Sequence, residues 1–221
     1  MSTTRRADSR RTYDNSRRRA DAEGRQRRIV DAATALFVEQ GFGGTSIDQI
    51  AAAADVSPQT VYATYGSKAA VLSRAIDVAV VGDYEAASLA DRMPVLADMS
   101  SKQHHLYFAT AARFVRALHE RVVPLMRVML QAAATDPGLE ELRMRLTHEI
   151  RADCEVWVAQ LGPALRRGLT KARAADVMVT IQSPYIYSMF TVDLGWSPDQ
   201  YERWLAHALP HMLLRPELLS G

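Results

Sequence analysis

The sequence predicts an all-α fold. Apolar side chains recur at spacings of three and four residues along most of the chain, which is the period of an amphipathic helix. A capping residue stands directly before proline at Ser57-Pro58, Asp136-Pro137 and Ser197-Pro198, and this pair marks the start of a helix. No segment shows the alternation of polar and apolar residues that is expected of a strand. We therefore expect helices throughout.

The composition bounds the class of protein. With 221 residues and 48% hydrophobic content, the chain can bury a core, but its apolar runs are far shorter than the about 20 residues of a membrane span. The N-terminus lacks the apolar segment of a secretory signal. The single cysteine, Cys154, excludes an internal disulfide and a zinc site built from cysteines. We expect a cytoplasmic protein with no cofactor, no metal and no membrane partner.

The net charge of +2 conceals an uneven distribution. Residues 1–28 contain ten arginines and four acidic residues, whereas the rest of the chain has 17 basic and 21 acidic residues. Residues 1–20 contain almost nothing to bury, so we expect them to be disordered in isolation. The pattern indicates a basic arm attached to a mildly acidic globule.

The first helix is expected from about Ala22 to Gln40, with Gly41 ending it. Thr45 is the expected N-cap of a second, short helix, with Asp48 at its third position. Asp55 then falls in a tight connection, where aspartate tolerates the left-handed conformation better than most residues.

Ser57 and Pro58 open a third helix, which Gly66 ends, and Ser67 caps a fourth. The remaining helices are expected at about 101–120, 122–135, 137–161, 171–193 and 198–213. The helix at 171–193 is apolar almost all round, so it needs cover on two sides. A second subunit is a natural cover in so short a chain.

Two short helices joined by about three residues are typical of a helix-turn-helix. In that motif the second helix presents its N-terminal residues to base edges in the major groove. Here this helix begins at Ser57-Pro58 and is rich in short polar side chains near its start.

The stretch from Thr45 to Leu72 resembles the DNA-binding domain of the TetR/AcrR family of bacterial repressors. The matching positions are Val56-Ser57, Tyr62, Tyr65, Ser67-Lys68 and Leu72. The chain departs from the family pattern at Asp55 and Gln59, where glycine is common, and at Tyr65, where phenylalanine is common. Ala63 and Thr64 are smaller than the basic or histidine residues often found there.

The resemblance implies an N-terminal three-helix DNA-binding domain at 21–68, after the arm at 1–20, and a helical ligand-binding and dimerisation domain at 69–221. It implies a ligand-released repressor that binds a palindromic double-stranded operator as a homodimer. The residues expected to contact DNA are Arg17, Arg18, Arg19, Thr45, Ser57, Pro58, Gln59, Thr60, Tyr62, Thr64 and Lys68.

The later helices supply candidates for the other two surfaces. A pocket for a small apolar or amphipathic ligand would draw on Phe108, Phe114, Met126, Met129, Trp157, Met178 and Tyr185. Methionines and aromatics at helical spacing also occur as ordinary core, and this alternative stays open. The dimer interface would draw on Ile186, Tyr187, Phe190, Trp204, Leu205 and Ala208.

Other functions are weighed against this one. An architectural DNA-binding protein with weak sequence preference, or a regulator gated by a protein partner, would share the same helix-turn-helix. An enzyme is not expected, because no glycine-rich phosphate loop, His-Glu-x-x-His or Gly-x-Ser-x-Gly occurs. His207 and His211 have metal-ligand spacing, but Pro210 lies between them and no third ligand is evident.

Overall fold

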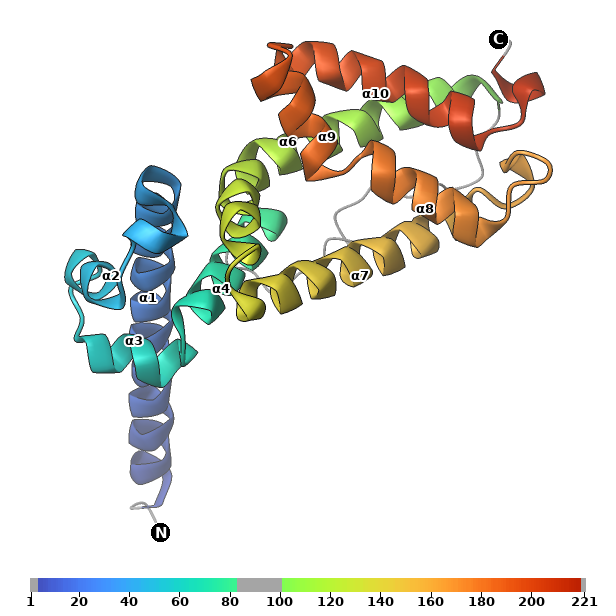
Figure 1. Cartoon of the computed structure of the whole chain (residues 1–221). Coiled ribbons are helices and arrows are strands. Elements are labelled where there is room, and N and C mark those ends of the chain that lie inside the picture. The colour runs from blue at the N-terminus through green and yellow to red at the C-terminus, as the bar shows by residue number, and fades with distance from the viewer. Residues whose placement is uncertain (1–3, 83–100, 220–221) are drawn as a thin grey trace. The chain divides into compact units, whose positions relative to one another are not determined.

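The structure, a computed structural model, describes the backbone of residues 4–82 and 101–219 and the side chains of residues 18–82 and 104–219. The predicted all-α fold is confirmed: apart from one isolated bridge between Leu165 and Leu214, these residues form only helices and turns (Figure 1). The helices are α1 (Thr4–Gly44), α2 (Ile47–Ala53), α3 (Pro58–Tyr65), α4 (Lys68–Val81), α6 (Ser101–Ala133), α7 (Pro137–Gln160), η1 (Gly162–Ala164), α8 (Lys171–Ile181), α9 (Pro184–Ser188), η2 (Met189–Asp193), α10 (Pro198–Leu213) and η3 (Pro216–Leu218).

The chain divides into two compact units, Met1–Ala75 and Ile76–Gly221. The division falls inside α4 rather than at its start, where the sequence placed it. The first half of α4 buries Val71, Leu72 and Ala75. Its last turns, from Ile76 onward, belong to the second unit.

In the first unit, α1 begins at Thr4, whereas we expected residues 1–20 to be disordered. No glycine or proline interrupts the sequence from Thr4 to Glu23, and arginine and alanine are good helix formers. An ion pair of 3.0 Å joins Arg19 to Glu23 one turn later. The expected break at Gly41 is confirmed by its φ of +73° inside α1.

The start of α2 corrects the expected cap. Ser46, not Thr45, is the N-cap: its hydroxyl accepts from the Gln49 amide, and the Gln49 side chain accepts from the Ser46 amide. Asp55 has a φ of 54°, the only positive value at a non-glycine residue among those described, so the expectation for the α2–α3 turn is confirmed. The Val56 amide closes this turn by donating to the Ala51 carbonyl.

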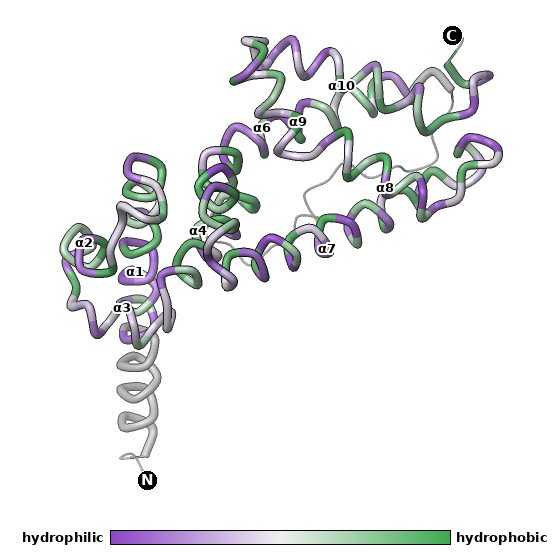
Figure 2. Tube along the Cα trace, in the orientation of Figure 1, coloured by the Kyte–Doolittle hydropathy of each residue, from purple (hydrophilic) through white to green (hydrophobic). Residues whose placement is uncertain are grey.

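In the second unit, α6 packs against α7 and α10, and α8 packs against α7 (Figure 1). Along α7, hydrophilic and hydrophobic stretches alternate within each turn (Figure 2), and Leu139, Leu142, Leu146 and Cys154 are buried. The helix α7 thus has one solvent-exposed face and one face packed against the core.

Two predicted helix boundaries in this unit are wrong. The segments 101–120 and 122–135 form one helix, α6, because the burial of Val123, Leu125 and Met126 offsets the hydrogen bond lost at Pro124. The segment 171–193 is instead broken into α8, α9 and the π-helix η2. Ser183 caps α9 and Pro184 is its first residue, which is the same signal that opens α3 and α10.

An aromatic cluster joins α6, α9, η2 and α10. The ring of His119 lies 5.2 Å from Tyr187, which lies 4.8 Å from Tyr201. Phe190 lies 4.5 Å from Trp196 and 4.5 Å from Trp204. The cluster therefore packs α6, which carries His119, against the last helices of the chain.

Candidate functional site

Helix α3 carries the first candidate surface. Ser57 caps it by accepting from the Thr60 amide, and Pro58 is its first residue. Val61 is fully buried and anchors one face, whereas Gln59, Tyr62 and Thr64 are exposed on the remainder. The first turns of the helix therefore present polar side chains to solvent.

The exposed side chains of α3 differ in how far they are already engaged. The hydroxyls of Ser57 and Thr60 lie 2.9 Å apart, and the Thr64 hydroxyl donates to the Thr60 carbonyl at 2.7 Å. Gln59 and Tyr62 have no hydrogen-bond partner in the described part of the chain, and 54% of Tyr62 is exposed. These two side chains are the ones best placed to take an external partner.

Two residues predicted to hold phosphates have internal roles instead. Thr45 is buried, and its hydroxyl lies 3.1 Å from the Leu36 carbonyl and 2.8 Å from the Gly41 carbonyl. The Lys68 ammonium donates to the carbonyls of Phe42 and Thr45 at 2.6 and 2.7 Å and lies 4.2 Å from the Phe42 ring centroid. Both side chains hold together the junction of α1 and α2.

The predicted basic arm lies on α1. Arg17, Arg18 and Arg19 are consecutive residues of this helix. Arg18 and Arg19 are exposed. Consecutive helical residues point about 100° apart, so Arg18 and Arg19 point to different sides of the helix.

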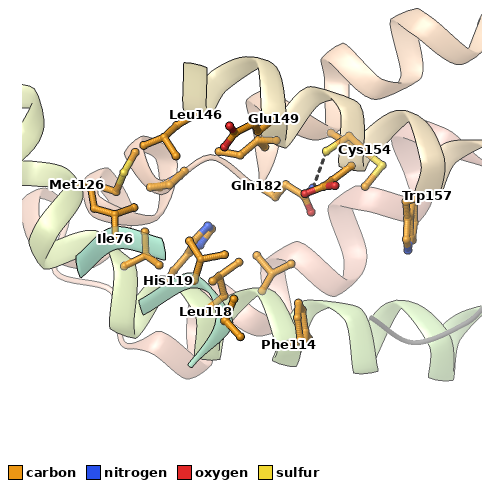
Figure 3. A pocket seen from close by; sticks show the side chains of 18 of the residues that line it. Ile76, Phe114, Leu118, His119, Met126, Leu146, Glu149, Cys154, Trp157 and Gln182 are labelled. Carbon is orange, nitrogen blue, oxygen red and sulfur yellow. Dashed lines mark hydrogen bonds between the residues drawn. The ribbon is translucent and has the colours of Figure 1, made fainter. Parts of the chain in front are cut away.

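The second unit contains a cavity of about 260 Å³ (Figure 3). Its volume is just below the roughly 300–1,000 Å³ typical of ligand pockets. The walls are mainly apolar and come from α4, α6, α7 and α8, with Pro184 of α9 closing one side. Its exposed lining residues, Glu149, Asp153, Val156 and Gln160, all lie on α7, so the cavity opens along that helix.

The sequence found part of this lining. Phe114, Met126, Trp157 and Met178 line the cavity as predicted. Phe108 and Met129 do not line it, because both are fully buried in the packing between helices. Tyr185 also lies outside the lining, with 46% of the residue exposed to solvent.

The cavity wall also contains polar side chains, among them His119, Cys154 and Gln182. Burial lowers the pKa of His119 to about 3, against a hydrogen bond with the Gln182 backbone that raises it. The Nδ1 atom of this ring has no hydrogen-bond partner in the described structure. The Gln182 amide donates to the Cys154 sulfur at 3.2 Å, and burial raises the pKa of that thiol to about 11. His119 lies four residues after Val115 and three before Val122, and this helical spacing is the signal that could have found it.

The predicted dimer residues divide by burial. Tyr187 and Leu205 are buried inside the second unit, so they are not free to contact another chain. Ile186, Phe190, Trp204 and Ala208 are half-buried against the same core. Sequence reasoning missed the most exposed apolar side chains nearby, Met189, Val192 and Leu194, because they follow the break before α9.

The residues that the structure describes contain no group of three His, Cys, Asp or Glu side chains arranged to hold a metal ion. They also contain no helix with the length and apolarity needed to span a bilayer.

The architecture and the exposed α3 define the class of helix-turn-helix regulators. Residues 29–75 match the family model described as bacterial regulatory proteins of the tetR family. The chain is 33% identical over 132 residues, 59% of its length, to the uncharacterized HTH-type transcriptional regulator YdeS of Bacillus subtilis. That match covers 61% of the relative. Over residues 29–75 the chain is thus similar to bacterial regulatory proteins of the tetR family.

Solved structures share the fold. NalD, the secondary repressor of the MexAB-OprM multidrug efflux pump in Pseudomonas aeruginosa, has a TM-score of 0.61 at 19% identity, covering 88% of this chain and 99% of its own. A SmeT–triclosan complex has a TM-score of 0.66 at 19% identity, covering 88% and 93%. SmeT is the repressor of a multidrug efflux pump of Stenotrophomonas maltophilia. These relatives are transcriptional regulators, not enzymes.

Proposed function

We propose that this protein is a transcriptional repressor that binds a palindromic DNA operator as a homodimer and is released by a small ligand. The observation that carries the proposal is the exposed polar face of α3, anchored by Val61 and matched to the family's DNA-binding domain. A helix that packs against its own domain along one face and exposes polar side chains along the other can lie in the major groove.

The residues of α3 have distinct proposed roles. Gln59 reads a base, since glutamine pairs bidentately with adenine, and Tyr62 contacts a base or the adjacent backbone. Ser57, Pro58 and Thr60 form the helix N-terminus, where amides and the helix dipole favour a phosphate. Thr64 and the arginines at 17–19 add phosphate contacts, and those arginines would strengthen the salt dependence of binding.

The homodimer is proposed from the last helices. Met189, Val192 and Leu194 are each at least half exposed on η2 and the residue after it, next to the half-buried Phe190 and Trp204. An apolar group of this kind marks a protein contact. A two-fold dimer gives two copies of α3, and a palindromic operator mirrors that symmetry.

Release by a ligand is proposed from the cavity and α4. Ile76, Asp77, Val80 and Val81 of α4 line the cavity, while the first half of the same helix belongs to the DNA-binding unit. The Arg121 guanidinium of α6 donates to the carbonyls of Ala79 and Val80. A ligand that favours another position of α4 would shift the population of operator-binding dimers.

The test is selection of bound duplexes from a random DNA pool by the full chain, first alone and then with candidate ligands. We expect a palindromic consensus with half-sites one helical turn apart, and its loss with an effective ligand. A shallow preference without symmetry would favour the architectural alternative. A consensus that no ligand alters would favour gating by a protein partner.

Gln59→Ala provides the matched test of base reading. It should relax the preference at one base pair of each half-site, at a cost of about 1–3 kcal/mol. Gln131→Ala, at an exposed position on α6, should leave the consensus and affinity unchanged. The same consensus from wild type and Gln59→Ala would remove Gln59 from the reading surface.

A further inference from the structure

The charged groups of the cavity all have one sign. Its lining contains the carboxylates of Asp77, Glu149 and Asp153 and contains no lysine or arginine. An apolar pocket without a cation would exclude an anionic ligand, because a buried negative charge needs a partner. The lining therefore selects against acids.

Two of these carboxylates mark the opening. Glu149 and Asp153 lie one turn apart on α7, and both are exposed at the mouth of the cavity. Carboxylates at this spacing repel each other. Burial and the neighbouring Glu149 raise the pKa of the Asp153 carboxyl.

The two carboxylates differ in their partners. Glu149 is paired with Arg145 at 2.9 Å. In contrast, Asp153 has no cationic partner among the residues that the structure describes. A cation at the mouth would neutralise Asp153 and relieve its repulsion with Glu149.

A second and independent observation lies deeper in the wall. His119 is 2% exposed, and its Nδ1 has no hydrogen-bond partner among the described residues. The ring donates to the Gln182 backbone through its other nitrogen, so in the neutral ring Nδ1 is the acceptor, and it lacks a donor. His119 on α6 and Glu149 on α7 stand on different walls of the cavity (Figure 3). A bound molecule can supply the missing donor.

We propose that the cavity binds a small organic cation: an apolar, aromatic-sized body with a protonated amine between Glu149 and Asp153 and an N–H or O–H donor for Nδ1 of His119. This inference rests on the proposed role of the second unit as a ligand sensor. The apolar lining takes the body, and the rim and His119 take its polar groups.

The test uses four probes of one shape, measured by calorimetry on the full chain. Tryptamine carries both the ammonium and a donor N–H, and 3-propylindole replaces the ammonium with a methyl group. Indole-3-propionate carries a negative charge instead, and 1-methyltryptamine lacks the ring donor. We expect tryptamine to bind about five- to tenfold more tightly than 3-propylindole and indole-3-propionate not to bind. Added salt should weaken only the cations.

Variants assign the effect to residues. Asp153→Asn should weaken tryptamine about fivefold and leave 3-propylindole unchanged. Glu141→Gln, an exposed acidic residue of α7 outside the cavity, is the matched control. His119→Phe should abolish the advantage of tryptamine over 1-methyltryptamine, and a thermal melt verifies that it folds.

Three results would overturn the proposal: equal or tighter binding of 3-propylindole or indole-3-propionate, no binding of any probe, or no effect of Asp153→Asn. Operator binding, measured on the same preparations without probes, is independent of these outcomes. Failure of the cation proposal can therefore be told apart from failure of the proposed function.

Discussion

Lys68 shows how a residue at a DNA-binding position can serve the fold. A lysine in the first turn of a helix opposes the helix dipole. In this chain it donates to two carbonyls that follow the break in α1 and lies over the Phe42 ring. The contacts with the protein offset the unfavourable position, so the side chain secures α4 to the junction of α1 and α2.

Lys68→Met should therefore lower the free energy of unfolding by about 1–3 kcal/mol, because two carbonyls lose their charged donor. Urea denaturation measures this loss. Lys171→Met, at an exposed first residue of α8, should change stability by less than about 0.5 kcal/mol. If Lys68 acts on phosphate instead, Lys68→Met would lower the salt slope of DNA binding by about one and leave stability intact.

His119 makes stability depend on pH. Its pKa in the folded chain, about 3, lies below the ordinary value of 6.5, so the unfolded state binds more protons between these values. Stability is then full above pH 6.5 and falls as the pH falls toward 3, by about 2 kcal/mol at pH 5. Unfolding curves at pH 7 and pH 5 should show this difference in wild type, and His119→Phe should reduce it. His148→Gln, at an exposed site, should keep it.

At the scale of elements, the α2–α3 turn depends on one residue in an uncommon conformation. Asp55 has a φ of 54°, a value that glycine adopts freely and a β-branched residue does not. The turn fixes where α3 begins, because the Val56 amide bonds back to α2.

Substitutions at Asp55 should follow this backbone requirement. Asp55→Gly should be as stable as wild type or more so, whereas Asp55→Val should lose about 1–2 kcal/mol. Thermal melts of the two variants give the order. Equal stability of Asp55→Val and wild type would show that the turn relaxes to another conformation.

Local sequence signals predicted most of the helix starts. They did not predict the boundaries that depend on long-range packing. Ser57-Pro58, Asp136-Pro137 and Ser197-Pro198 each start a helix as predicted, because a cap and a proline act within one turn. Pro124 failed as a boundary, since tertiary burial of its neighbours overrides its local cost. Ser183-Pro184 was an equally local signal and was overlooked in an apolar run.

The residues of the candidate site likewise fall into those that a local motif predicts and those that depend on tertiary packing. Gln59, Tyr62 and the frame of α3 followed from a contiguous motif, whereas Thr45 and Lys68 depend on where α1 ends relative to α2 and α4. The cavity combines residues from helices far apart in the sequence, such as Ile76, His119 and Gln182. Periodicity marks these residues as inward-facing, but it does not separate a cavity wall from a filled core.

At the scale of the whole molecule, the proposed mechanism requires both dimerisation and a shift between two states. Moving such an equilibrium from 1:99 to 99:1 takes about 5.5 kcal/mol of differential ligand binding. The helix α4 contributes its first half to the DNA-binding unit and its last turns to the cavity wall.

Leu194→Glu tests the dimer. Leu194 is 61% exposed in one chain, so the substitution should leave the monomer fold intact while placing a charge in the proposed interface. Light scattering should show a shift toward monomer, and operator affinity should fall with it. Met144→Glu, at a position on α7 that is 43% exposed, should remain dimeric. A dimeric Leu194→Glu would place the interface elsewhere.

The aromatic cluster and the cavity also give the molecule an optical property. The chain has three tryptophans: Trp157 in the cavity wall, and Trp196 and Trp204 against Phe190. The DNA-binding unit contains none. Emission excited at the indole band therefore originates wholly in the second unit, so tryptophan fluorescence reports on the unit that contains the cavity and does not report directly on α3.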